Sequence, residues 1–76
     1  MPLYHLLLKH PDGSDGEMAD AEFRNDAVAI DDARRALAAM AREAAQQGHT
    51  LADVIEVLNE VGTVIAVVSL EAGHQP

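Results

Sequence analysis

Four histidines are the residues of this 76-residue chain best able to bind a metal ion or transfer a proton. They are His5, His10, His49 and His74. No two of them have the i, i+4 spacing of a helical zinc site, and the chain has no cysteine. His10 with Asp12 and Asp15 could hold a weak ion, but a solvated turn is the simpler interpretation of so short a motif. We therefore expect no metal site and no cofactor.

Catalytic chemistry has equally little support in the sequence. Ser14 and Ser69 are the only serines, and neither lies in a nucleophile elbow. Gly13 and Gly16 do not have the spacing of a phosphate-binding loop. With one Tyr, one Phe and no Trp, the chain has little material to enclose a substrate pocket of roughly 300–1,000 Å³. We expect no enzyme and no small-molecule substrate.

The charge distribution restricts the possible partners. The formal net charge is −8, and eight acids lie between Asp12 and Asp32 against one base, Arg24. Such a balance opposes binding to a phosphate backbone, so we expect no direct contact with nucleic acid. A basic protein partner, or mimicry of nucleic acid, stays open. No apolar run approaches the ~20 residues that span a bilayer, and no signal peptide is visible, so the prediction is a cytoplasmic protein.

One long segment, about residues 31–47, has helical chemistry. It contains no Gly, no Pro and no β-branched residue, and its apolar side chains recur on one side. Asp31 is a suitable N-cap, and Gly48 suits the end of the helix. Alternatively the helix begins near Ile30, and Asp31 then pairs with Arg35 four residues later.

Four strands complete the expected fold, at about residues 3–9, 27–29, 54–59 and 63–70. Turn residues at 11–16 follow the first strand, the segment from Glu17 to Asp26 has no clear assignment, and residues 71–76 form a frayed tail. The sequence predicts a single α+β domain over residues 1–76, of ββαββ order. A small antiparallel sheet would carry the helix on one face.

Several short motifs together resemble a family of short bacterial proteins known only as a domain of unknown function. The motifs are Met1-Pro2-x-Tyr4, the Asp12-Gly13 turn, Ala33-Arg34-x-x-Leu37 and Ile55-Glu56-Val57-x-x-Glu60-x-Gly62-x-Val64. The chain departs from the family pattern in having Leu7 where a histidine is frequent, and no large residue near Asp53. The resemblance implies the strand–strand–helix–strand–strand shape and no known activity.

A weaker likeness is to the HicB-like antitoxins, which also place an Asp-Gly-Ser turn after a strand and an acidic cap before a helix. His10-Pro11-Asp12-Gly13-Ser14 and Ile30-Asp31-Asp32-Ala33 carry this likeness. The characteristic second strand is missing, and we expect no DNA-binding segment after the domain. This resemblance implies, as an alternative function, an antitoxin half that neutralises a basic toxin.

The two faces of the expected sheet lead to a prediction about association. Nine residues should lie under the helix: Tyr4, Leu6, Leu8, Ile55, Val57, Val64, Ala66, Val68 and Leu70. Five aliphatic residues would then occupy the opposite face: Leu7, Val54, Leu58, Ile65 and Val67. An exposed apolar face usually marks an interface, so we expect a non-catalytic interaction module that forms a homodimer, through this face or a strand edge. A one-residue register error, or coverage of the patch by the tail, stays open.

Overall fold

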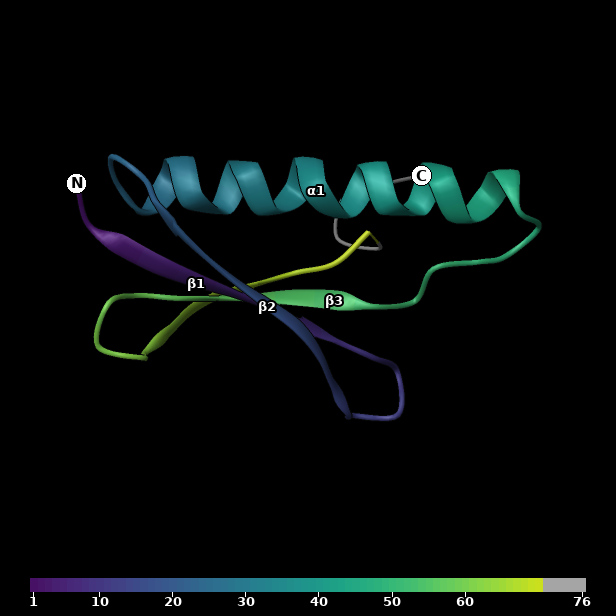
Figure 1. The fold of residues 1–76 in the computed structure, drawn as a ribbon, viewed down its shortest axis with the longest axis horizontal. Helices are drawn as coiled ribbons and strands as arrows, with labels where there is room; N and C mark the ends of the chain where they lie inside the picture. Colours follow the sequence, from purple (N-terminus) through teal and green to yellow (C-terminus); the bar gives the residue numbers. More distant parts are fainter. Residues whose placement is uncertain (71–76) are drawn as a thin grey trace.

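The computed structural model describes residues 1–70 and shows one helix layered on one sheet (Figure 1). In chain order the elements are β1 (Leu3–Lys9), β2 (Asp15–Glu22), α1 (Asp26–Gln46), β3 (Val54–Leu58) and β4 (Val64–Val68). The strands lie in the order β2-β1-β3-β4, and all neighbours are antiparallel. The predicted ββαββ α+β fold is confirmed. The tail predicted at 71–76 lies outside the described residues.

The second strand lies elsewhere than predicted. It is β2, Asp15–Glu22, and residues 27–29 belong to α1. Half of β2 is acidic, and it contains no β-branched residue, so its own sequence gives little strand signal. Pairing with β1 determines its conformation, with Tyr4 opposite Ala21 and Leu6 opposite Ala19.

The helix begins at Asp26, five residues before the start expected at about residue 31, and its cap lies six residues before Asp31. Asn25 is the N-cap, and its side-chain oxygen accepts a hydrogen bond from the Val28 amide at 3.0 Å. Asp26 follows in the first turn, where the helix dipole favours a carboxylate. The buried positions Ala29, Ala33 and Leu37 continue one helical face, and this packing outweighs the strand preference of Val28 and Ile30.

The core lies between α1 and the sheet face beneath it. Its buried members are Tyr4, Ala29, Ala33, Leu37, Ile55, Val57 and Val68. Buried alanines on α1 let the helix approach the strands closely, while Leu37 fills the space between them. Helix α1 packs mainly on β3 and β4. Within residues 1–70, the structure has no helix with the length and apolar character needed to cross a bilayer.

A bulge in the β3–β4 pair corrects the predicted faces of two residues. Val57 lies opposite Ala66, but Leu58 lies opposite Val64, so Ile65 is the extra residue of β4. Ile65 packs against the core instead of lying on the opposite face. Val64, expected under the helix, is 46% exposed. The prediction from alternating residues was wrong for this part of β4, because one inserted residue reverses the sheet face of the residues beyond it.

Candidate interaction surfaces

The face of the sheet that points away from α1, here called the outer face, is the first candidate. Strand register arranges it in rows, the central row being Met18, Leu7, Glu56 and Val67. A neighbouring row contains Asp20, His5, Leu58 and Val64. Met18 and Val67 are 57% and 58% exposed. The rows therefore place apolar side chains from all four strands on one surface.

Acidic residues of β2 lie next to a histidine and a lysine of β1 on the outer face. His5 Nδ1 is 2.7 Å from Asp20 Oδ1, and Lys9 Nζ is 2.6 Å from Asp15 Oδ1. The hydrogen bond and charge of Asp15 raise the pKa of Lys9, and the carboxylate of Glu56 raises it further. The Lys9 ammonium therefore interacts with carboxylates of two strands, Asp15 of β2 and Glu56 of β3. The carboxylate of Asp20 lies next to His5.

The structure brings together four of the five residues predicted for the interface. Leu7, Val54 and Leu58 are half-buried, Val67 is exposed, and Ile65 packs against the core. The sequence prediction missed Met18 and Val64. Met18 stands apart as an apolar residue within an acidic segment, which could have indicated it, whereas Val64 reaches this face only through the bulge.

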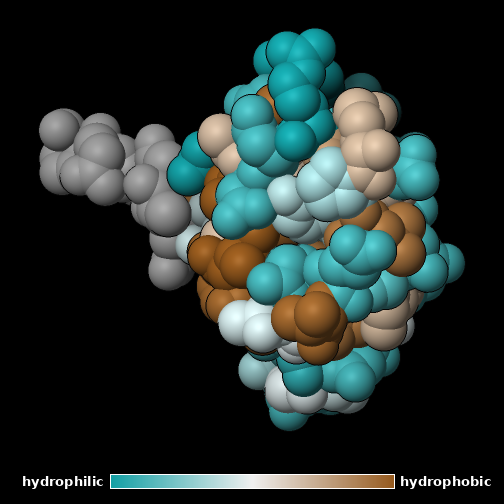
Figure 2. Space-filling view, turned by 90° about the vertical axis from the view of Figure 1, so that its left-hand side faces the viewer, coloured by the Kyte–Doolittle hydropathy of each residue, from teal (hydrophilic) through white to brown (hydrophobic). Residues whose placement is uncertain are grey.

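Apolar side chains also reach the surface elsewhere, as separate patches. Figure 2 shows the end of the molecule at which α1 begins, where apolar patches alternate with polar ones. Met1, Val28 and Val61 are 76%, 42% and 84% exposed, respectively. Exposed aliphatic residues of this scattered kind are ordinary in a small domain, so they indicate no site by themselves.

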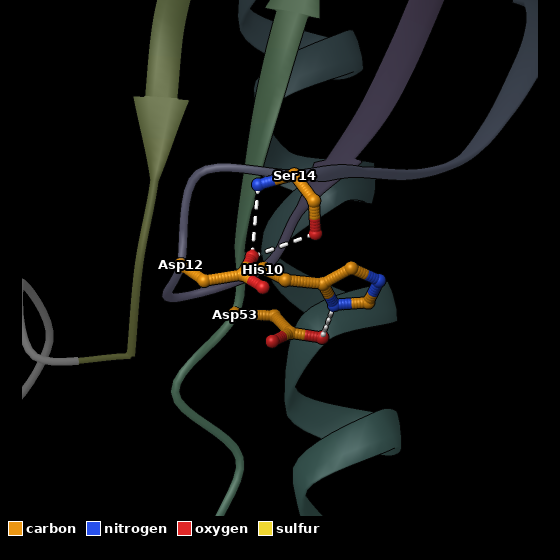
Figure 3. Close-up of polar contacts among 4 residues, drawn as sticks. All are labelled: His10, Asp12, Ser14 and Asp53. Atoms are coloured by element: carbon orange, nitrogen blue, oxygen red, sulfur yellow. Dashed lines mark hydrogen bonds and ion pairs between the residues drawn. The ribbon is translucent and has the colours of Figure 1, made fainter.

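The polar residues of the β1–β2 turn form a small cluster that links it to the segment before β3 (Figure 3). His10 Nδ1 lies 3.1 Å from Asp53 Oδ2, although the two residues are 43 positions apart. Asp12 accepts hydrogen bonds from the Ser14 amide and hydroxyl at 2.9 and 2.6 Å. The Ser14 hydroxyl lowers the pKa of Asp12, because it stabilises the carboxylate.

The contacts of this cluster hold two segments of the chain together. The Ser14 hydroxyl donates to Asp12, whereas His10 contacts Asp53, so the cluster lacks the hydrogen-bonded serine–histidine pair of an activated nucleophile. Within residues 1–70, no group of three His, Asp or Glu side chains could hold a metal ion. His10, Asp12 and Asp15, considered above as a weak ion site, take part in three separate interactions, with Asp53, Ser14 and Lys9 respectively.

The second candidate surface is an apolar groove on the helix side of the sheet. It has a volume of about 370 Å³ and lies between α1 and the β1–β2 hairpin. Its lining residues are Leu6, Leu8, Glu17, Met18, Ala19, Ala36, Met40 and Ile55. The groove exists because α1 lies over β3 and β4, so it leaves the other half of the sheet less covered.

These features define a small ββαββ domain with two apolar candidate surfaces, the outer face and the groove. The chain belongs to the family DUF6894, a domain of unknown function, whose model matches residues 7–71. This agrees with the resemblance drawn from the sequence motifs. Comparison with curated proteins and with solved structures finds no match.

Proposed function

We propose that this domain acts by binding protein, without catalysis, and that it forms a homodimer through the outer face. The observation that carries the proposal is the exposure of Met18, Val64 and Val67, at 57%, 46% and 58%, on the same face as half-buried Leu7 and Leu58. An antiparallel sheet that meets water on one side is normally polar there. Burial of each large aliphatic side chain would contribute roughly 1.5–3 kcal/mol before the costs of association.

A second copy of this chain suits the outer face as its partner. Two copies, each with a net charge of −8, repel each other in most orientations. On the outer face, however, the Lys9 ammonium lies 2.6 Å from the Asp15 carboxylate and also interacts with that of Glu56, which reduces the repulsion there. A twofold dimer also requires one patch to be complementary to itself, and an apolar patch meets that requirement.

Light scattering on the wild type and on the double variant Val64→Lys, Val67→Glu tests the homodimer. We expect the wild type to be a dimer at ~100 μM, a concentration at which an interface of micromolar affinity is filled. The double variant should be folded and monomeric. Val61→Lys, an exposed position in the β3–β4 turn, is the matched control and should stay dimeric. A wild-type monomer at this concentration contradicts the proposal.

A second candidate function is the binding of a basic protein, which the HicB-like resemblance also implies. One observation favours it: β2 is an edge strand and exposes the carboxylates of Asp15, Glu17, Asp20 and Glu22.

We further propose that the domain acts in the cytoplasm and does not bind nucleic acid. Gel shifts with duplex and single-stranded probes test the latter, and salt-sensitive submicromolar binding would contradict it. Binding of either probe in these gel shifts would also contradict mimicry of nucleic acid, because a mimic should itself bind no probe.

A further inference from the structure

The apolar groove on the helix side of the sheet has the form of a vacant place for a second helix. Figure 1 shows the β1–β2 hairpin running diagonally away from α1 toward its turn. Leu6, Leu8 and Ile55 form the floor of the groove between them, and Ala36 and Met40 form the α1 wall. Ala19, on the opposite wall, is exposed although it points to the helix side of the sheet.

The dimensions of helices and sheets explain why one helix leaves this space. A helix with its side chains is about 10 Å wide, and neighbouring strands are ~4.8 Å apart, so one helix covers roughly two strands. Helix α1 packs mainly on β3 and β4, and the part of the sheet formed by β2 and the second half of β1, with Leu6 and Leu8, remains less covered. An occupant of helical width therefore fits the uncovered half.

The margins of the groove are acidic. Glu17 lies in its lining on the β2 side. On α1, Asp32 stands four residues before Ala36, and Glu43 three residues after Met40, so helical spacing places both carboxylates along the same wall. Arg34, Arg35 and Arg42 lie about 100° or more around the helix from Ala36. An apolar floor between acidic margins matches a ligand with an apolar stripe flanked by bases.

We propose that this groove binds an amphipathic, basic helix of another protein. The inference rests on the second candidate function above, the binding of a basic protein, and is independent of the homodimer. A second copy of this chain does not meet the requirement, because the apolar face of its own α1 is buried in the core. Met40 gives the groove an adaptable wall, which suits helices of varied sequence.

The first test measures binding of a synthetic helical peptide of about 18 residues, five turns, with leucines along one face and lysines elsewhere. A peptide with glutamates in place of the lysines, and a scrambled lysine peptide, are the ligand controls. We expect saturable micromolar binding of the lysine peptide alone. Binding that is absent, or equal for the scrambled peptide, overturns the proposal.

Two pairs of variants locate the binding site. Ala36→Arg fills the groove and should weaken binding at least tenfold, whereas Ala38→Arg, an exposed position on the other side of α1, should leave it unchanged. Glu17→Lys should also weaken binding, and Glu60→Lys in the β3–β4 turn should not. If Glu17→Lys weakens binding while Ala36→Arg does not, the basic partner binds β2 without the groove. That result overturns this inference and leaves the second candidate function standing.

Methionine methyl NMR on the wild-type chain provides a test that needs no variant to fold. The chain has three methionines, of which Met40 lines the groove and Met1 lies at the other end of the molecule. The lysine peptide should shift the Met40 methyl resonance and leave that of Met1 unchanged. A repeat on the Val64→Lys, Val67→Glu variant separates this site from the homodimer, since the shift should persist. A resonance of Met40 that does not move overturns the proposal.

Discussion

At the scale of single residues, the Tyr4 phenol connects the first strand to the start of the helix. Its hydroxyl donates a hydrogen bond of 2.6 Å to Asp26 Oδ1, and its ring lies 5.9 Å from that of Phe23. The hydrogen bond to Asp26 raises the pKa of Tyr4, and burial and the nearby carboxylate charge raise it further. The neutral phenol is the form that the fold requires.

Tyr4 should therefore titrate above its ordinary pKa of about 10. Stability from this contact should be fully present below pH ~10 and lost as the pH rises through the raised pKa of the folded state. Because Tyr4 is the only tyrosine and the chain has no tryptophan, its ultraviolet absorbance reports the ionisation directly. Asp26→Asn should bring the pKa back toward the ordinary value. An unchanged pKa in that variant would show that Asp26 is not the cause.

A second residue-scale prediction concerns Gly16, which lies against the imidazole of His10. A Cβ added at Gly16 would lie 2.9 Å from His10 Nε2 and 3.2 Å from Leu8 Cδ2. Gly16→Ala should therefore displace the ring from Asp53 and destabilise the fold by about 1 kcal/mol, the low end of overpacking costs. Urea unfolding measures the loss.

A double-mutant cycle identifies the cause of that loss. In a His10→Ala background the ring is absent, so Gly16→Ala should cost clearly less than in the wild type. An equal cost in both backgrounds would mean that Leu8, or the backbone, requires the glycine. Gly13 differs from Gly16 in the reason for its glycine. A Cβ added at Gly13 would meet nothing within 4 Å, but the positive φ of 89° there favours glycine.

At the scale of the element, the two residues that could cap α1, Asn25 and Asp31, should differ in how much they contribute to the free energy of unfolding. Asn25→Ala removes the side chain that accepts from the Val28 amide and should cost about 1 kcal/mol of the free energy of unfolding. Asp31→Ala should cost only ~0.2–0.5 kcal/mol, since it removes an exposed i, i+4 pair with Arg35. Urea unfolding of both variants measures the difference. Asn25→Asp is the control and should retain stability, whereas a larger loss for Asp31→Ala would contradict this helix start.

At the scale of the whole molecule, the net charge of −8 predicts opposite effects of salt on folding and on partner binding. Raising sodium chloride from ~0.01 to ~0.15 M shortens the Debye length from ~30 to ~8 Å. The melting temperature should rise, because repulsion among the carboxylates is screened. Homodimerisation should strengthen for the same reason, while binding of the lysine peptide should weaken. A melting temperature that falls over this range would contradict the prediction.

The sequence by itself determined the features that depend on short stretches of chain. The alanine-rich segment predicted the helix as far as its end at Gln46, and β1, β3 and β4 were indicated by their own apolar residues. The ββαββ order and the antiparallel sheet were also predicted, although the second strand was misplaced at residues 27–29.

Only the tertiary structure decided the rest, because each remaining feature depends on a partner distant in the chain. Segment β2 is a strand since β1 pairs with it, and the helix extends back to Asp26 since Ala29 packs on the sheet. The bulge at Ile65 exchanged its predicted position with that of Val64, and local alternation contains no signal of such an insertion. The groove beside Met40 arises because one helix is narrower than four strands, a consequence of packing that no single segment encodes.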